Sequence, residues 1–569
     1  MSGAATVTGR HPALTALGRA ADALTRHVAI ALGAVVATQI LATVALFLSI
    51  NHNGWLTYQG GDQIWLVTNG WLLGKGTIGY AFNSYGWPML LAPLTWITGS
   101  SSIQLLPLTT TLQVCLLGPL ATLAVYDIGA RLAGRLAGLW CAVVFVAAPF
   151  AAIPYFIQRY HDSWVDQVLP QALGLTQQAD FPSVVAILGA AAFTVRALEA
   201  DAERAAVLAG TFAGVAIAFK PSNALFIAAP ALALLLARRW RHLALLAVAI
   251  APALIALTIW KEKGLGAVPL FAESSTRLAA GLGDPVLAQS WYERTFDFDL
   301  DSWKQNMSNL REFSRSARVV QFLPLAGAIA VARRSVPGAA FLLTWLLAFV
   351  IVKGSASVAS IEAGSFWRLV MPGLPAFALL AAAVPLLVPT VLGRLGDRLA
   401  PRPARSPSLR ATAALVAVLG GIPIAVLLAA TPLRAEANPA PPPRYFVDAL
   451  LIDNNEVPVD ASVIALEARR TGSVVELRWT DSTTRAETFY RVFRSTDAGG
   501  YPPDTVCELR GAEQCELRSE TLVTTREHRF VDSEAPAGAV YRIGVAANWL
   551  DDPDRGDVFA VSPPVVASG

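Results

Sequence analysis

Charged side chains are scarce in this sequence of 569 residues. They make up 15% of the chain, against about 25% in soluble globular domains, and 54% of the residues are hydrophobic. This balance excludes a wholly soluble protein, so we expect an integral membrane protein that also has a water-soluble part. The net charge of +3, without any basic tract, gives no reason to expect a nucleic acid as partner.

Several well-known catalytic signatures are missing as well. The sequence has no Gly-rich phosphate-binding loop of the Walker type, which a nucleotide-driven transporter would need. It has no HExxH zinc motif, and its six histidines are scattered along the chain. Any chemistry must therefore come from other side chains.

Cysteine is rare, with four in the whole chain. Cys115 and Cys141 lie inside apolar runs, where we expect them to be ordinary core residues. Cys507 and Cys515 lie in the hydrophilic C-terminal region, close enough in sequence to pair. If that region is outside the cytoplasm, a disulfide between them is expected.

Long apolar runs are abundant, in contrast. A membrane-spanning helix needs about 20 apolar residues, and the runs here predict about eleven spans. They are centred on 28–50, 103–126, 136–157, 182–197, 204–219, 223–238, 243–260, 318–333, 338–352, 370–391 and 411–431. The expected fold class is therefore mainly α, a polytopic membrane domain over residues 28–432. The polar and basic residues 1–27 are expected to form a cytoplasmic tail rather than a cleaved signal peptide.

Arginine is distributed unevenly over the loops between these runs, and short cytoplasmic loops carry an excess of Arg and Lys. With the N-terminus inside, the inner loops carry Arg131 and Arg135; Arg196 and Arg204; Arg238, Arg239 and Arg241; Arg333 and Arg334; and Arg394, Arg398, Arg402, Arg405 and Arg410. The outer loops hold the acids Asp62, Asp162, Asp166, Asp180, Glu273 and Asp284. We expect any chemistry on this outer face. The near-absence of lysine is typical of a GC-rich bacterial genome, so the predicted location is a bacterial plasma membrane.

After residue 432 the composition changes. Residues 433–454 form a linker whose first part, LRAEANPAPPPRY, is rich in proline and semi-rigid. From 455 to 569 the apolar period becomes two, as in SVVELRW, which predicts an extracytoplasmic all-β sandwich. Trp479, Tyr541 after a turn, and the final GDVFAVSPPV resemble a fibronectin type III module. Its expected role is to stabilise or space the protein, or else to bind a glycan or position an acceptor.

The segment TYQGGDQIWLVTNGWLLGKGT, 57–77, contains a single carboxylate in the first outer loop. Asp62 follows two glycines and precedes a helical pattern, so it is a good candidate for a helix N-cap. The helix would place Ile64, Trp65, Val67, Trp71 and Leu72 on one apolar face, as in a helix that lies along the membrane surface. Capping and catalysis are both open readings of Asp62 from these residues alone.

The wider context of Asp62 resembles the GT-C superfamily of multi-spanning glycosyltransferases. These enzymes use lipid-phosphate sugars, and they include protein O-mannosyltransferases and aminoarabinose transferases. The resemblance is carried by the acid in the first outer loop, the helix after it, and the aromatic and Pro-rich GYAFNSYGWPMLLAPL. It implies that Asp62 is the catalytic base. Many members have two adjacent acids here, whereas this chain has Asp62-Gln63, so one position matches.

A second match lies in FWRLVMPGLPAFALL, 366–380. An arginine followed by two prolines that open a late helix resembles the same superfamily, which implies that Arg368 contacts the donor phosphate. A guanidinium also binds phosphate well on chemical grounds, although an arginine that only snorkels at a helix end is the alternative. Lys353 and Lys220, each at the outer end of a predicted helix, are further candidates for the donor phosphate.

The stretch RYHDSWVDQ, in the second outer loop, offers Arg159, His161, Asp162 and Asp166. Asp162 and Asp166 are four residues apart and would share a helix face. Oligosaccharyltransferases of the same superfamily place acidic metal ligands in this loop, so its position implies a site for Mg or Mn. An acceptor groove and a solvated loop are the alternatives.

Together these features predict an enzyme that moves a single sugar from a polyprenyl-phosphate donor to an extracytoplasmic glycan, lipid or protein. Asp62 would take the acceptor proton and Arg368 would hold the phosphate, with inversion implied by the resemblance. The 261–317 loop would be a lid, an acceptor surface or a passive connector. A transporter or flippase of a lipid-linked sugar and a membrane-anchored scaffold are the rivals. The lack of a clear internal repeat favours the enzyme over the transporter.

Overall fold

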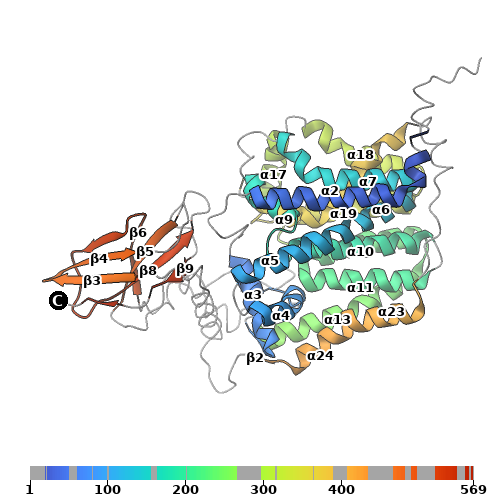
Figure 1. Ribbon diagram of the computed structural model, residues 1–569. Helices are drawn as coiled ribbons and strands as arrows, with labels where there is room; N and C mark the ends of the chain where they lie inside the picture. Colours follow the sequence, from blue (N-terminus) through green and yellow to red (C-terminus); the bar gives the residue numbers. More distant parts are fainter. Residues whose placement is uncertain are drawn as a thin grey trace, which may run out of the picture.

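The computed structural model describes residues 19–20, 22–49, 61–79, 81, 83–98, 102–155, 163–199, 202–265, 296–313, 317–362, 364–388, 407–432, 465–480, 488–495, 519–547, 558–562 and 565–567. Up to residue 432 it is a layered stack of helices, most of which run alongside one another, and the C-terminal region is made of strands (Figure 1). The expected combination of a mainly helical body with a C-terminal β region is confirmed.

The first half of the body contains α2 (Val28–Ser49), α3 (Gly61–Gly74), α4 (Gly86–Thr98), α5 (Ser102–Leu112), the π-helix η1 (Gln113–Leu117), α6 (Gly118–Ala133), α7 (Arg135–Tyr155), the π-helix η2 (Ser163–Val168), α9 (Leu169–Ala172) and α10 (Asp180–Glu199). The second half contains α11 (Glu203–Phe219), the 3₁₀ helix η3 (Pro221–Ile227), α12 (Ala228–Leu236), α13 (Trp240–Leu265), α17 (Leu300–Phe313), α18 (Ala317–Ala332), α19 (Val336–Val352), α20 (Ser365–Val370), η5 (Met371–Gly373), α21 (Leu374–Ala383), η6 (Val384–Leu387), α23 (Leu409–Val416), η7 (Ala417–Gly421) and α24 (Ile422–Ala429).

Seven helices of the described residues are long and apolar enough to cross a membrane. They are Val28–Ser49, Leu105–Ala133, Arg135–Ala152, Asp180–Glu199, Trp240–Gly264, Ser365–Leu387 and Leu409–Ala429. Three shorter apolar helices are Pro221–Leu236, Phe322–Ala332 and Val336–Val352. Every apolar run identified in the sequence therefore coincides with helical structure, but seven rather than eleven meet the length and hydropathy of a span. The count of eleven stays a prediction.

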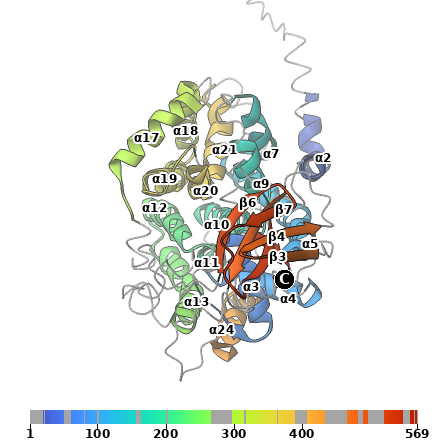
Figure 2. The same ribbon diagram turned by 90° about the vertical axis from the view of Figure 1, so that its left-hand side faces the viewer.

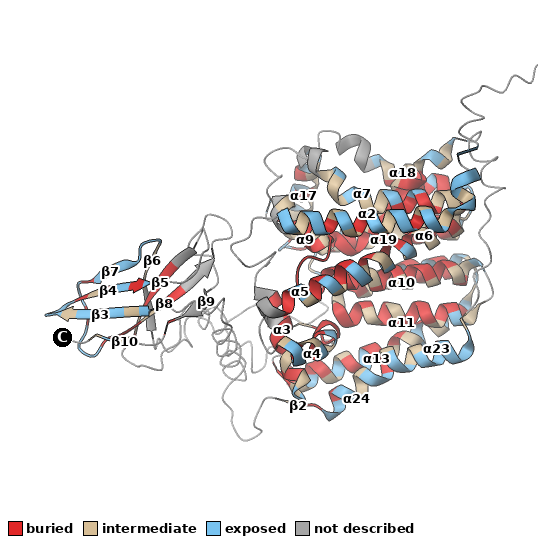
Figure 3. Ribbon diagram, viewed as in Figure 1, coloured by how far each residue is buried: buried red, intermediate tan, exposed pale blue. Residues whose placement is uncertain are grey.

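The helices differ in how far their surfaces are covered (Figure 3). α10 and α11 are buried on most sides, whereas α2 exposes half of its residues and α23 more than half. Small residues explain the central position of α11, because a Cβ on Gly214 would lie 2.9 Å from Ala253 Cβ of α13. A helix that is apolar all round has to be covered by protein or lipid.

Cys141 is buried as expected, but Cys115 is exposed on η1, so the expectation of a core position was wrong for Cys115.

One end of the stack is rich in arginine and is held by ion pairs. Asp127 Oδ2 accepts hydrogen bonds from Arg131 Nε at 3.0 Å and from Arg196 Nε at 3.1 Å. Arg333 Nη1 donates to the carbonyl of Leu387 at 3.0 Å on the same side of the stack. We call this the arginine-rich end. The opposite end, formed by α3, α4, α9 and α20, is called the site end and faces the viewer in Figure 2. Gathering of the arginines at one end is the pattern predicted from the loops, while the cellular side of each end stays a prediction.

A short parallel ladder joins the segment after α3 to the last residues of the membrane domain. Strand β1 (Thr77–Ile78) follows α3, and it pairs with β2 (Thr431–Pro432), which follows α24. Next to it, Lys263 Nζ donates to the carbonyls of Leu428 at 2.7 Å and Ala430 at 2.6 Å. The exit of the last span is therefore fixed beside the chain that follows α3.

The C-terminal strands form two sheets. One consists of β3 (Ala465–Thr471), β4 (Val474–Thr480) and β7 (Arg529–Asp532), and the other of β5 (Thr488–Ser495), β6 (Ser519–Thr525), β8 (Val540–Ala547), β9 (Val558–Val561) and β10 (Val565–Val566). Inward-facing side chains from both sheets share one core, which includes Val475, Leu477, Trp479, Val492, Tyr541 and Ile543. The period-two segments coincide with strands, and the sequence pattern missed β6. The segment with Cys507 and Cys515 lies outside the described residues, so their disulfide stays a prediction.

Candidate active site

A buried carboxylate and two cations meet at the site end. Asp180, the first residue of α10, is 3% exposed. Its Oδ1 accepts a hydrogen bond from Lys220 Nζ at 2.6 Å, and its Oδ2 accepts one from Arg368 Nε at 3.2 Å. A carboxylate withdrawn from water in this way needs hydrogen-bonded partners of opposite charge. We call Asp180, Lys220 and Arg368 the ion cluster.

The local sequence explains how the two cations reach Asp180. Lys220 follows the last residue of α11 and precedes Pro221, and proline forces the residue before it into an extended backbone. Its φ of −149° and ψ of 111° are of this kind, so the chain turns away from the helix at the lysine. Arg368 lies in the last turn of α20, a six-residue helix that starts after Gly364 at φ +73°, a left-handed conformation that glycine adopts without strain.

The loop that leads into α10 is held by buried carboxamides from two other helices. Gln113 Nε2 of η1 donates to the carbonyl of Thr176 at 2.6 Å. Gln63 Oε1 of α3 accepts from the backbone N–H of Gln177 at 2.7 Å, and the carbonyl of Gln177 accepts from Trp87 Nε1 of α4 at 2.6 Å. Each partner satisfies a backbone group that burial would otherwise leave unpaired. The start of α10, and with it Asp180, is therefore fixed.

Asp62, the predicted base, is attached to the same region through its neighbour. Gln63 is 1% exposed and binds Gln177, and Asp180 lies three positions after Gln177, a span of at most about 11 Å. Within the described residues α3 begins at Gly61, so Asp62 lies in the first turn, where a negative charge is favourable, rather than at the N-cap. The side chain of Asp62 lies outside the described part, and its role as base stays a prediction.

The helix that contains Asp62 was expected to lie along the membrane surface, and its position relative to the membrane stays a prediction; the structure adds that protein covers it. Thr68 and Asn69 are buried together with Leu66, Val67 and Leu73, so polar and apolar positions of α3 alike are covered by protein. Gly70 packs against α4, where an added Cβ would meet Leu91 Cβ at 2.9 Å. The amphipathic pattern identified the helix but not the protein layer that covers its polar side.

The remaining predicted residues fall into two groups. Lys353 is 5% exposed at the C-terminal end of α19, where Gly354 contacts the α20 residue Phe366. Arg159, His161 and Asp162 lie outside the described residues, and Asp166 is placed in η2 without a described side chain. Among the residues whose side chains are described, no group of three His, Cys, Asp or Glu could hold a metal ion. The proposed Mg or Mn site stays a prediction, and no step of the proposed reaction depends on it.

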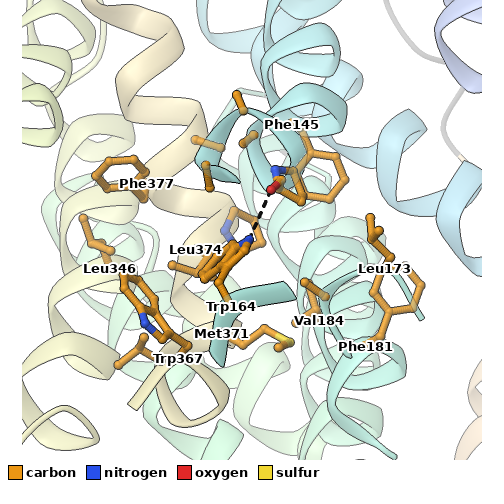
Figure 4. A pocket seen from close by; sticks show the side chains of 18 of the residues that line it. Phe145, Trp164, Leu173, Phe181, Val184, Leu346, Trp367, Met371, Leu374 and Phe377 are labelled. Carbon is orange, nitrogen blue, oxygen red and sulfur yellow. Dashed lines mark hydrogen bonds between the residues drawn. The ribbon is translucent and has the colours of Figure 1, made fainter. Parts of the chain in front are cut away.

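An apolar cavity of about 500 Å³ adjoins the ion cluster (Figure 4). Its walls come from α2, α7, η2, α9, α10, α17, α18, α19, α20 and α21, and its lining includes Phe145, Leu173, Val184, Leu346, Leu374 and Phe377. Two lining residues, Phe181 and Trp367, are the direct chain neighbours of Asp180 and Arg368. The rings of Trp164 and Trp367 meet edge to face at 5.4 Å, and Trp164 Nε1 donates to the carbonyl of Pro149. A hydrocarbon volume thus borders the ion cluster.

Sequence reasoning found the two cations and missed the residue that joins them. Asp180 was recognised as an acid of an outer loop, but it received no role. A signal was present in the sequence. Two cations expected on the outer side, against the general inward bias of positive charge, indicate an anion between them.

No protein-family model matches the chain, and no curated protein matches it. Among solved structures it is similar to the oligosaccharyltransferase of Archaeoglobus fulgidus. The apo form is 13% identical with a TM-score of 0.37, over 74% of this chain and 59% of that one. The complex with Zn and sulfate is 16% identical with a TM-score of 0.39, over 74% and 55%. The form tethered to an acceptor peptide containing the NVT sequon is 15% identical with a TM-score of 0.38, over 75% and 57%. This chain spans less than 60% of the length of that protein, and scores this low establish neither activity nor ligands.

Proposed function

We propose that the protein is a membrane glycosyltransferase that takes its sugar from a polyprenyl-phosphate donor. The observation that carries the proposal is the apolar cavity of about 500 Å³ beside the ion cluster. A ligand that fills both regions has a hydrocarbon chain and an anionic head, as a lipid phosphate does. The resemblance of FWRLVMPGLPAFALL and of the Asp62 segment to the GT-C superfamily supports the same class of donor.

The two halves of the donor would be bound by different forces. The prenyl chain enters the cavity lined by Phe145, Leu346 and Phe377, where burial of apolar surface stabilises it. The phosphate lies against Lys220 and Arg368, whose side chains are 20% and 32% exposed and so remain accessible. A charge-assisted hydrogen bond from a guanidinium to phosphate is stronger than a neutral one. Lys353 is a further cation for this phosphate in our proposal.

The chemistry is a displacement at the anomeric carbon of the sugar. Asp62 accepts the proton of the acceptor hydroxyl while the oxygen of that hydroxyl bonds to the anomeric carbon. The bond from that carbon to the phosphate oxygen breaks, and the electron pair stays on the phosphate. Lys220 and Arg368 offset the negative charge that develops there. The acceptor is an extracytoplasmic glycan, lipid or protein, and the C-terminal sandwich, fibronectin type III-like in this proposal, spaces or positions it.

The first test is transfer by the full-length protein in lipid vesicles, supplied with a panel of radiolabelled polyprenyl-phosphate sugars. Asp62→Asn removes the base but keeps the shape of the side chain, so we expect kcat to fall by about 10²–10⁴-fold with donor binding retained. Arg368→Ala removes a phosphate ligand, so we expect the KM for donor to rise by about tenfold or more. Arg333→Ala, at the arginine-rich end, is the matched control and should leave both constants unchanged.

Two outcomes would overturn the proposal. If Asp62→Asn keeps its activity within a few-fold, Asp62 serves the start of α3 and not the reaction. If the wild-type protein moves labelled lipid between leaflets and forms no glycosidic bond, the protein is a transporter of lipid-linked sugar. Melting of each variant in detergent separates loss of function from loss of fold.

A further inference from the structure

One carboxamide lies in the wall of the apolar cavity. Among the described residues that line the cavity, Gln39 of α2 is the one polar side chain that is not aromatic. The residue is 9% exposed, so protein covers nearly all of it. A polar side chain inside a membrane-spanning helix is costly, and such residues usually face the protein interior and have a function. Gln39 therefore needs an explanation that the apolar residues around it do not.

Two positions of α6 hold this carboxamide in one orientation. Its Oε1 accepts a hydrogen bond from Thr122 Oγ1 at 2.6 Å. Its Nε2 lies over Gly118, one turn earlier on α6, where an added Cβ would come within 3.2 Å of that nitrogen. Among the described residues, no group accepts a hydrogen bond from Nε2. The carboxamide thus brings to the cavity a nitrogen whose N–H groups have no protein acceptor.

The depth of Gln39 can be read along the helix that binds it. Gln113 lies near the site end, where it holds the carbonyl of Thr176, and α6 ends beside Arg131 at the arginine-rich end. Thr122 follows Gln113 by nine positions of the continuous span Leu105–Ala133, which is a distance of about 13 Å along the helix. This distance exceeds the length of one isoprene unit. Gln39 therefore meets a bound chain well below its phosphate.

A hydrocarbon chain in the cavity has to cover the free N–H groups of Gln39. An N–H that is covered and not hydrogen-bonded is costly. A saturated chain offers it no acceptor, whereas π electrons accept a weak hydrogen bond from an N–H. A polyprenyl chain has a double bond in each isoprene unit. The chain of the proposed donor is of this kind, and the role inferred for Gln39 rests on that proposed function.

We propose that Gln39 is a specificity-determining residue that makes the cavity favour an unsaturated isoprenoid chain over a saturated chain of the same length and branching. An N–H of its carboxamide donates to the π electrons of a double bond beyond the first isoprene unit. A saturated chain covers the same N–H and accepts nothing from it.

The test is binding of three lipid phosphates to the full-length protein in nanodiscs of neutral lipid with saturated acyl chains. Geranylgeranyl phosphate has a double bond in every isoprene unit. Phytyl phosphate keeps only the one beside the phosphate, and phytanyl phosphate has none. All three share chain length, methyl branches and head group. We expect the wild type to bind geranylgeranyl phosphate about two- to fivefold more tightly than phytyl phosphate.

The deciding variant is Gln39→Met, which keeps the size of the side chain and removes the donor. Phytyl phosphate should bind about fivefold or more tightly than to the wild type, because no N–H is left unsatisfied. Geranylgeranyl phosphate should gain less, so the ratio of the two affinities falls by about two- to fivefold. The ratio of phytyl to phytanyl phosphate should not change, since the first double bond lies above Gln39. Partition into the disc is the same for both proteins and cancels in this comparison.

Two threonines supply the control and a second variant. Thr43 is buried on α2, one turn after Gln39, and is not among the residues that line the cavity, so Thr43→Val should leave every ratio at its wild-type value. Thr122→Val keeps the glutamine but removes the hydroxyl that orients its carboxamide. The ratio of geranylgeranyl to phytyl phosphate should fall in this variant too, which decides the matter if Gln39→Met does not fold.

The inference is overturned if the wild type binds geranylgeranyl and phytyl phosphate equally, or if Gln39→Met weakens both by the same factor. The second result would mean that Gln39 only joins α2 to α6 through Thr122, as interhelical hydrogen bonds do in membranes. Either result leaves the proposed function standing, because the lipid phosphates still bind. If the wild type binds none of the three, the proposed function itself fails.

Discussion

Asp532 in the sandwich illustrates how a single carboxylate is stabilised by its neighbours. Its Oδ2 accepts hydrogen bonds from Tyr541 Oη at 2.7 Å and from Arg494 Nη1 at 2.9 Å, and its Oδ1 accepts one from the backbone N–H of Glu534 at 3.1 Å. Burial by itself would raise the pKa of Asp532. The hydrogen bonds from Tyr541 and Glu534, together with the hydrogen bond and charge of Arg494, outweigh burial and hold the pKa below its ordinary value.

The residue-scale prediction is acid sensitivity of the sandwich. The pKa of Asp532 is lower in the folded chain than in the unfolded chain, where it is about 3.9. The stabilisation that this carboxylate gives to the folded sandwich is therefore present above the unfolded pKa and is lost as the pH falls through the folded pKa. Asp532→Asn should lower the unfolding free energy of the sandwich by about 1.5–3 kcal/mol at pH 7 and flatten its dependence on pH below about 4.

The measurement is hydrogen exchange of β7 and β8 in the full-length protein, corrected for the intrinsic exchange rate at each pH. Glu467→Gln, at an exposed position of β3, is the control and should leave the protection unchanged. Equal loss of protection on acidification in wild type and Asp532→Asn would show that another group governs the acid response.

Single residues also mark the limit of what the sequence predicts. Arg368 was named as a candidate phosphate ligand from the resemblance of FWRLVMPGLPAFALL to the GT-C superfamily, and Lys220 because positive charge at the predicted outer end of a helix is unusual. Their shared partner was not identified, since Asp180 is 40 positions from Lys220 and 188 from Arg368. Only the packing of α10 beside α11 and η5 brings them together, and a linear pattern does not contain that information.

At the scale of elements, α17 was part of a segment expected to be a lid, an acceptor surface or a connector. One side of it is fixed to the 353–361 segment by Asn306, which is 2% exposed. Asn306 Nδ2 donates to the carbonyls of Gly354 at 3.2 Å and Ala359 at 2.8 Å, and its Oδ1 accepts from the N–H of Ile361 at 3.2 Å. Leu310 of the same helix lines the apolar cavity, so α17 covers part of it.

The element-scale prediction follows from these bonds. Asn306→Ala leaves two buried carbonyls and one N–H without their partner, at about 1–3 kcal/mol for each unsatisfied group. We expect faster hydrogen exchange across 354–361 and weaker binding of a prenyl phosphate, because one wall of the cavity loosens. Ser308→Ala, at an exposed position of the same helix, is the matched control. Unchanged exchange in Asn306→Ala would show that the apolar contacts of Met307 and Leu310 hold α17 without it.

Helices and strands were predicted well where the spacing of their apolar residues was clear. The apolar runs coincided with helices, and α3 was identified by its pattern although its surroundings were not. β6, Ser519–Thr525, was missed because its two large apolar residues, Leu522 and Val523, are adjacent rather than alternating with polar ones. Its place in a sheet therefore depends on pairing with β5. Strand pairing depends on the tertiary structure. The spacing of apolar residues in the sequence indicates it only where one face of the strand is strongly apolar.

At the scale of the whole molecule, the membrane domain and the sandwich have separate hydrophobic cores. We therefore expect deletion of residues 440–569 to leave sugar transfer to a small soluble acceptor within a few-fold of the wild-type rate, while transfer to a large acceptor falls. A chain that ends at residue 425 is the matched control. It lacks β2 and the carbonyls that Lys263 binds, so its melting temperature in detergent should fall. Complete loss of transfer after deletion of 440–569, with the membrane domain still folded, would favour the scaffold.

The pairing of β1 with β2 has a consequence for biogenesis. Ile78 is translated early and its partner Pro432 late, after every other part of the membrane domain. The chain after α3 can therefore take its final position only when the last span has left the ribosome and entered the bilayer. A polypeptide that ends before residue 431 would lack this pairing, so the membrane domain would reach its final arrangement only once its last residues had been synthesised.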